Sequence, residues 1–128
     1  DGRTPSELWR DNFLGCFITD PTALRTAERV GVGTVAWECD YPHSDSTWPR
    51  SPEQLWEELR GAGLTDADTV DMMTWQNASR FFRFDPFRHR SRADATVGAL
   101  RATATDVDVR VTSRTEYRRR YEAAHGAS

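Results

Sequence analysis

The stretch from residue 34 to residue 49, TVAWECDYPHSDSTWP, constrains the fold more than any other part of the chain. It opens on an apolar run with a β-branched start, Val35 to Trp37, which indicates a buried strand. Asp40 follows directly, and then a loop of aromatic and polar side chains that includes His43 and Trp48. A carboxylate at the carboxyl end of a buried strand, followed by such a loop, is how α/β barrels build their sites.

The predicted elements before residue 84 alternate between helix and strand, so the chain is assigned to the α/β class. Phe13 to Ile18 (FLGCFI) is an uninterrupted apolar run, typical of a strand buried on both faces, and Thr34 to Cys39 forms a second strand. Capping boxes that begin at Thr4 and Ser51 start two helices. Together with the apolar spacings they predict helices over residues 5–12, 21–30, 51 to the glycines at 61 and 63, and 65–82.

One polar residue interrupts the apolar stripe of the last of these helices, which Thr65 is expected to cap. The stripe reads Val70, Met73, Asn77 and Phe81, at spacings of three and four. If Asn77 is buried there, its amide must find hydrogen-bond partners. We expect a structural hydrogen bond that ties this helix to a neighbouring loop, in preference to a substrate contact.

Residues 85–128 differ in composition and are predicted to form a C-terminal extension. Phe84-Asp85-Pro86 ends the preceding helix, and a basic, polar stretch follows. A short helix is expected over 96–103, an exposed strand over 107–111, and a last helix capped near Ser113. We expect this extension to wrap over the main domain or to form a homo-oligomer interface.

Composition excludes several classes of function. The formal net charge of −3 gives no electrostatic support for a nucleic-acid or membrane-surface role, and no apolar run approaches the roughly 20 residues that span a bilayer. All 17 basic residues are Arg, so chemistry that needs a lysine amine is excluded from this segment. Cys16 and Cys39 lack a CxxC spacing and are expected to be buried free thiols of a cytoplasmic protein.

Residues 39–49, CDYPHSDSTWP, resemble a family signature. The amidohydrolase-related metal-dependent hydrolases and decarboxylases carry S-D-Y-P-H-S-D-S-T-W-P at the end of the eighth and last strand of a TIM barrel. A similar N-A-x-R-x-F segment occurs in their last core helix, here residues 77–82. The resemblance covers about residues 5–84 and implies the last two strand–helix units of a (β/α)8 TIM barrel. Cys39 stands where the family usually has Ser.

The resemblance also implies a chemistry. Asp40 matches the family's last metal-ligand position, with zinc the expected metal, and His43 and Trp48 become candidates for substrate binding. The intact protein would be a metal-dependent hydrolase or a non-oxidative decarboxylase acting on a small molecule with a carboxylate or carbonyl group. The family's other ligands are histidines that cannot be matched here, because His43, His89 and His125 have the wrong spacing. The 128-residue chain alone is therefore expected to be inactive.

Each of these readings has an alternative. From the residues alone, Asp40 is equally a turn carboxylate that caps the backbone amides of 41–43. His43 is equally a loop-packing histidine, and Trp48 more often covers the rim of a barrel than the floor of a pocket. At the level of the whole chain, the alternatives are a non-catalytic binding or assembly module derived from the same barrel, or a small α/β module that covers its sheet edges by self-association.

Overall fold

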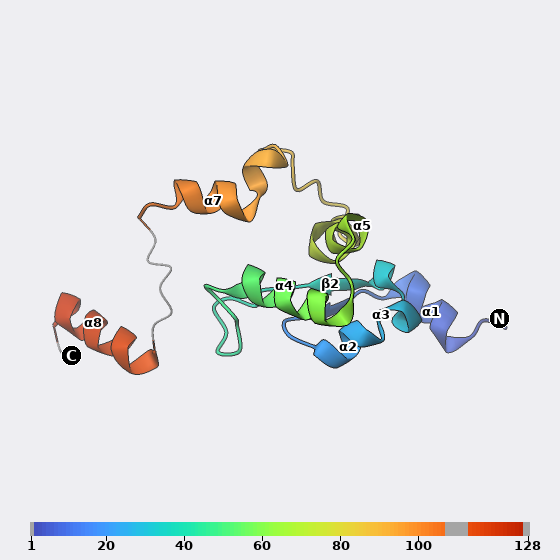
Figure 1. Ribbon diagram of the computed structural model, residues 1–128, viewed down its shortest axis with the longest axis horizontal. Helices are drawn as coiled ribbons and strands as arrows, with labels where there is room; N and C mark the ends of the chain where they lie inside the picture. The colour runs from blue at the N-terminus through green and yellow to red at the C-terminus, as the bar shows by residue number, and fades with distance from the viewer. Residues whose placement is uncertain (1, 107–112, 127–128) are drawn as a thin grey trace.

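The computed structural model describes residues 2–106 and 113–126. Its elements run in the order helix, strand, helices, strand, helices (Figure 1). In the first half they are α1 (Pro5–Asn12), β1 (Gly15–Phe17), α2 (Pro21–Arg25), α3 (Ala27–Val30), the 3-10 turn η1 (Val32–Thr34), β2 (Val35–Trp37) and α4 (Ser51–Ala62). The second half holds α5 (Ala67–Asp71), the π-helical segment η2 (Met72–Gln76), α6 (Asn77–Phe81), the 3-10 turn η3 (Ala93–Ala95), α7 (Val97–Thr103) and α8 (Arg114–His125).

The two strands form a parallel sheet in which Gly15 pairs with Val35 and Phe17 with Trp37. The helices α2 and α3 lie between them in the chain, so the unit is a β–helix–β crossover. Both strands are shorter than the predicted apolar runs. Within the described residues the sheet has no third strand, and Cys16 in β1 is exposed. The prediction of a strand buried on both faces, with a buried Cys16, is therefore wrong here, because nothing among the described residues covers this side of β1.

The hydrophobic core lies where β1 meets the helices. It contains six buried side chains from β1, α2, α3, α4 and η2: Phe17, Leu24, Ala27, Leu55, Leu59 and Met73. Trp37 of β2 packs against this cluster from its edge. The core thus fixes the end of β2, from which the candidate site projects.

Local capping explains where several helices begin. Thr4 Oγ1 accepts from Glu7 N at 3.3 Å while Thr4 N donates to the Glu7 carboxylate at 2.7 Å, which confirms the capping box of α1. The capping box predicted at Ser51 does not form. Ser51 is the first residue of α4 rather than its cap, and its hydroxyl lies 3.4 Å from Cys39 Sγ. The Ser51 hydroxyl thus contacts Cys39, just beyond β2, and does not bond a backbone amide of its own helix.

Residues 67–81 run as one helical stretch, α5–η2–α6. It is capped by Asp66, one residue later than expected, with Asp66 Oδ1 accepting from Thr69 N at 2.8 Å. Asn77 is 1% exposed, and its Nδ2 donates to Val32 O at 2.7 Å and to Val35 O at 2.8 Å. The predicted structural hydrogen bond is thus confirmed, and it joins this helix to the turn before β2.

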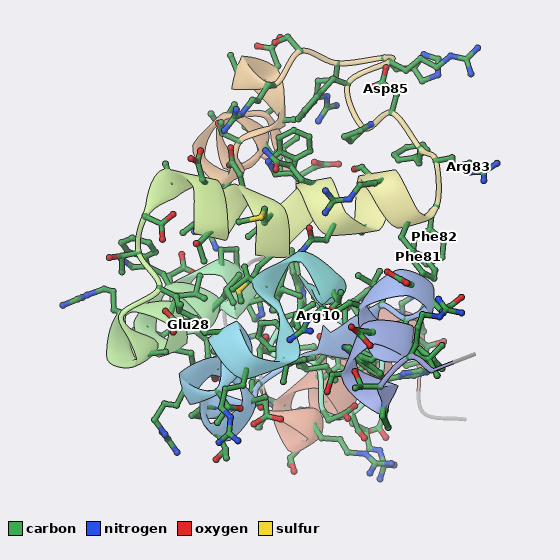
Figure 2. The ribbon with its side chains drawn as sticks, turned by 90° about the vertical axis from the view of Figure 1, so that its right-hand side faces the viewer. Arg10, Glu28, Phe81, Phe82, Arg83 and Asp85 are labelled. Atoms are coloured by element: carbon green, nitrogen blue, oxygen red, sulfur yellow. The ribbon has the colours of Figure 1, made fainter. Side chains whose placement is uncertain are left out.

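The helical stretch ends on a residue in the left-handed region. Arg83 has φ 53°, and Phe84 N donates to Ser79 O at 2.9 Å, which closes the end of the helix. Figure 2 shows Phe81 and Phe82 at this end. Both rings are exposed and meet edge to face, with centroids 5.2 Å apart.

Two arginines attach the extension to the main domain. Arg92 donates to Asp71 Oδ2 at 2.5 Å and lies over the Trp75 ring. Arg101 of α7 forms an ion pair with Glu53 of α4 and donates to a backbone carbonyl at 3.2 Å. Hydrogen bonding to Arg101 lowers the pKa of Glu53 to about 2.

The helices of the extension begin where the sequence predicts, and the last two carry side-chain caps. Thr96 Oγ1 accepts from Ala99 N at 3.2 Å, and Ser113 Oγ accepts from Glu116 N at 3.2 Å. The strand predicted over 107–111 lies outside the described residues. In the part of the chain that the structure covers, no helix has both the length and the apolar character needed to cross a membrane.

Candidate functional site

Asp40 lies three residues beyond β2, at the turn into the loop that leads to α4. Its φ of 52° is in the left-handed region, which a non-glycine residue enters only at a modest energetic cost and which Asp tolerates better than most residues. His43 N donates to Asp40 O at 2.9 Å, so residues 40–43 form a tight turn. This turn brings the side chains of Asp40 and His43, two of the three predicted site residues, into contact.

The side chains of Asp40 and His43 form a hydrogen-bonded pair. His43 Nδ1 donates to Asp40 Oδ2 at 2.8 Å. The hydrogen bond and the negative charge of Asp40 raise the pKa of His43 above its ordinary value, and the charge of Asp45 adds to the effect. The His43 side chain is 73% exposed, so Nε2 faces solvent while Nδ1 is engaged. The pair places an imidazole and a carboxylate together beyond the carboxyl end of β2.

A titration tests this pair. We expect the His43 imidazole signals, followed by nuclear magnetic resonance across pH, to report a pKa above about 6.5. Asp40→Asn should return the pKa toward that value, while Asp45→Asn should lower it by less, because Asp45 acts only through its charge. Since the folded pKa exceeds the unfolded one, the pair stabilises the fold below about pH 6.5 and loses this effect as pH rises through the folded pKa. Equal pKa values for His43 in Asp40→Asn and the unmodified chain would contradict the pairing.

Cys39 connects the end of β2, the loop and α4. Its Sγ lies 3.5 Å from Ser46 Oγ and 3.4 Å from Ser51 Oγ. Burial raises the pKa of this thiol, but hydrogen bonds from Ser51, Ser46 and the Tyr41 backbone outweigh burial and hold the pKa below its ordinary value. Cys39 is free, as predicted, but it is half-buried rather than buried, and it has polar partners that the sequence did not indicate.

Trp48 packs against Tyr41. Its ring meets Tyr41 edge to face at a centroid distance of 5.7 Å. Both rings line an open cleft of about 810 Å³ whose other wall is α8, and neither Asp40 nor His43 lines it. The structure therefore brings together two of the three predicted site residues. The signals for the missed cleft residues were Tyr41 inside the signature and the spacing of four between Tyr117 and Tyr121.

No group of three His, Cys, Asp or Glu side chains suited to a metal ion occurs among residues 2–106 and 113–126. His125 lies at the end of α8, where its ring stacks on Tyr121 at 4.3 Å. His43 already donates a hydrogen bond to Asp40.

The sequence matches no protein-family model, and no curated protein matches it. The resemblance of residues 39–49 to the amidohydrolase-related signature therefore remains a hypothesis carried by those residues.

Proposed function

We propose that this chain is the C-terminal part of a metal-dependent hydrolase or non-oxidative decarboxylase in which Asp40 is a metal ligand. The observation that carries the proposal is the position of Asp40. It lies just beyond the carboxyl end of β2, in the left-handed conformation, and is hydrogen-bonded to His43. Strained backbone of this kind tends to occur at functional sites, and the carboxyl ends of parallel strands are where barrel enzymes place their chemistry.

The parallel pairing of β1 and β2 supports the barrel part of the proposal. Two parallel strands joined through helices are the repeating unit of a (β/α)8 barrel, which takes eight such units and about 250 residues. In this proposal the other strands belong to a longer gene product. The free thiols Cys16 and Cys39 favour a cytoplasmic location.

The described residues do not complete a metal site. A catalytic zinc takes three protein ligands as a rule, and no such group of three includes Asp40 among the described residues. In the proposed enzyme the remaining ligands come from outside this chain.

The Asp40–His43 pair can still act on a substrate by itself. The carboxylate favours the protonated imidazole, because it accepts from Nδ1 and attracts the positive charge. In its protonated form the imidazole also carries Nε2–H, which can donate a charge-assisted hydrogen bond to an oxygen atom. This suits a small molecule that presents a carboxylate or carbonyl group, which is the substrate class that we propose.

Metal content tests the proposed function. We expect the complete gene product that contains this sequence, purified without chelator, to hold about one divalent ion per chain. Asp40→Ala should lose or weaken it, because a ligand is removed. Asp45→Ala, which deletes a carboxylate from the same loop, should retain it. The count is made by inductively coupled plasma mass spectrometry.

The competing hypothesis is a non-catalytic binding or assembly module that keeps the barrel framework. The observation in its favour is that the described residues contain no group of three His, Cys, Asp or Glu side chains that could hold a metal ion. No metal in either the unmodified protein or Asp40→Ala would support this module and make Asp40 a turn residue. A His-x-His pair after an early strand of the complete gene product would argue against it.

A further inference from the structure

A cleft of about 810 Å³ lies between the loop that follows β2 and the helix α8. In Figure 1, α8 lies on the side of the molecule where this loop projects beyond α4. The volume is in the range of about 300–1,000 Å³ that small-molecule sites occupy. Because Asp40 and His43 do not line it, the cleft is distinct from the site described above.

Aromatic rings form both walls of the cleft. Tyr41 and Trp48 stand on the loop, and Tyr117 and Tyr121 stand on α8 with ring centroids 6.4 Å apart. The exposed fractions of these four residues lie between 47% and 66%. Four large rings gathered around one cleft and left open to solvent are typical of a surface that binds something planar and apolar.

The charged side chains of the cleft are all basic. Arg114 and Arg120 line it, and no Asp or Glu is among its lining residues in the described chain. The guanidinium of Arg120 is engaged by Glu116, with Nε donating to Oε1 at 2.9 Å. Arg114 forms no ion pair with a described residue, so its charge is available to an incoming anion. Its bidentate geometry suits a planar anionic group such as a carboxylate.

We propose that this cleft binds a small molecule that carries a planar aromatic ring and an anionic group. The ring packs against the aromatic walls, and Arg114 pairs with the anion. The C-terminal extension thereby supplies half of a binding site whose other half is the loop that carries Asp40. This site needs no metal and does not depend on the proposed catalytic function.

Binding to the chelator-treated 128-residue chain tests the proposal, with naphthoate as the probe. Isothermal titration calorimetry should give the tightest binding for naphthoate. Naphthylmethanol lacks the charge and cyclohexanecarboxylate lacks the aromatic ring, so each should bind about tenfold more weakly. Resonance shifts on naphthoate addition should fall on the Trp48 indole and the Tyr117 ring. Equal affinities for all three probes would overturn the proposal.

Matched variants locate the site. Arg114→Ala should weaken naphthoate binding about tenfold and leave naphthylmethanol unchanged, and Arg114→Lys should restore part of the loss. Arg118→Ala removes a charge from the same helix outside the cleft and should change neither. Trp48→Ala should weaken both aromatic probes, whereas Phe82→Ala, an exposed ring elsewhere, should weaken neither. All of these side chains are on the surface, so the variants should fold.

Two results would contradict the assignment of the cleft. Equal losses in Arg114→Ala and Arg118→Ala would mean that naphthoate responds only to the overall charge of α8. Concentration-dependent self-association that Tyr117→Ala abolishes and naphthoate does not inhibit would mean that the cleft is a contact between copies of the chain. These binding measurements are made without metal, so a negative result would not bear on the proposed metal site. A protein without bound metal would likewise not bear on the proposed cleft.

Discussion

Replacing Asn77 with aspartate is expected to lower the free energy of unfolding by about 3 kcal/mol. Asn77 is buried and donates both protons of its amide, one to Val32 O at 2.7 Å and one to Val35 O at 2.8 Å. Aspartate is nearly the same size but has no N–H, so its oxygens would face two carbonyl oxygens. Arg80 donates to Asn77 Oδ1 at 2.5 Å and would offset only part of this repulsion.

The matched control is Asn12→Asp. Asn12 Nδ2 donates to Leu8 O at 2.9 Å on the exposed end of α1, where water can replace the lost partner. The expected loss there is under about 1 kcal/mol. Urea unfolding followed by circular dichroism compares the two variants. Equal losses at the two positions would show that the 67–81 helix does not depend on Asn77 for its attachment to β2.

The apolar spacing that singled out Asn77 was accurate only in the middle of its helix. Met73 and Asn77 are both buried, as the stripe requires. Phe81 belongs to the same stripe but is exposed, because the helix ends there and nothing among the described residues covers it. The π-helical segment was also not predicted. Asn77 N donates to Met72 O across five residues, a change of register that a spacing of three and four does not contain.

Caps were predicted to within one residue where the partner is local, with Asp66 in place of Thr65 before α5, and were missed where the competing partner is distant. Thr4, Thr96 and Ser113 cap the helices that follow them, because each bonds an amide within three residues. Ser51 has the same sequence pattern, yet its hydroxyl turns to Cys39, which folding brings close. A sequence pattern identifies a possible hydrogen bond to a nearby amide. It does not show whether a partner distant in sequence takes the same hydroxyl.

In the candidate site, too, residues were predicted from the sequence but their contacts were not. Asp40 and His43 were both predicted as site residues, but their contact depends on the positive φ of Asp40, which the sequence does not reveal. The cleft between the loop and α8 joins parts of the chain that are far apart in sequence. Its sequence signals were Tyr41 inside the signature and the spacing of Tyr117 and Tyr121 on one helix face, and that spacing equally describes an exposed helix.

The second large effect is expected in the core. Leu59→Ala should lower the free energy of unfolding by about 3 kcal/mol, because it removes apolar contacts and leaves a cavity. Leu59 is 1% exposed and belongs to the cluster with Leu24 and Met73. Small domains have only about 5–15 kcal/mol in total, so this loss should move the urea midpoint clearly.

Leu100→Ala is the matched control for Leu59→Ala. Leu100 lies in α7 of the extension and is 38% exposed, so the same deletion should cost less than about 1 kcal/mol. A large difference between the two leucines would mean that residues 1–84 hold the core and that the extension is attached mainly by polar contacts such as Arg92–Asp71 and Arg101–Glu53. Similar losses would mean that the extension shares the core, and the division at residue 84 would then be wrong.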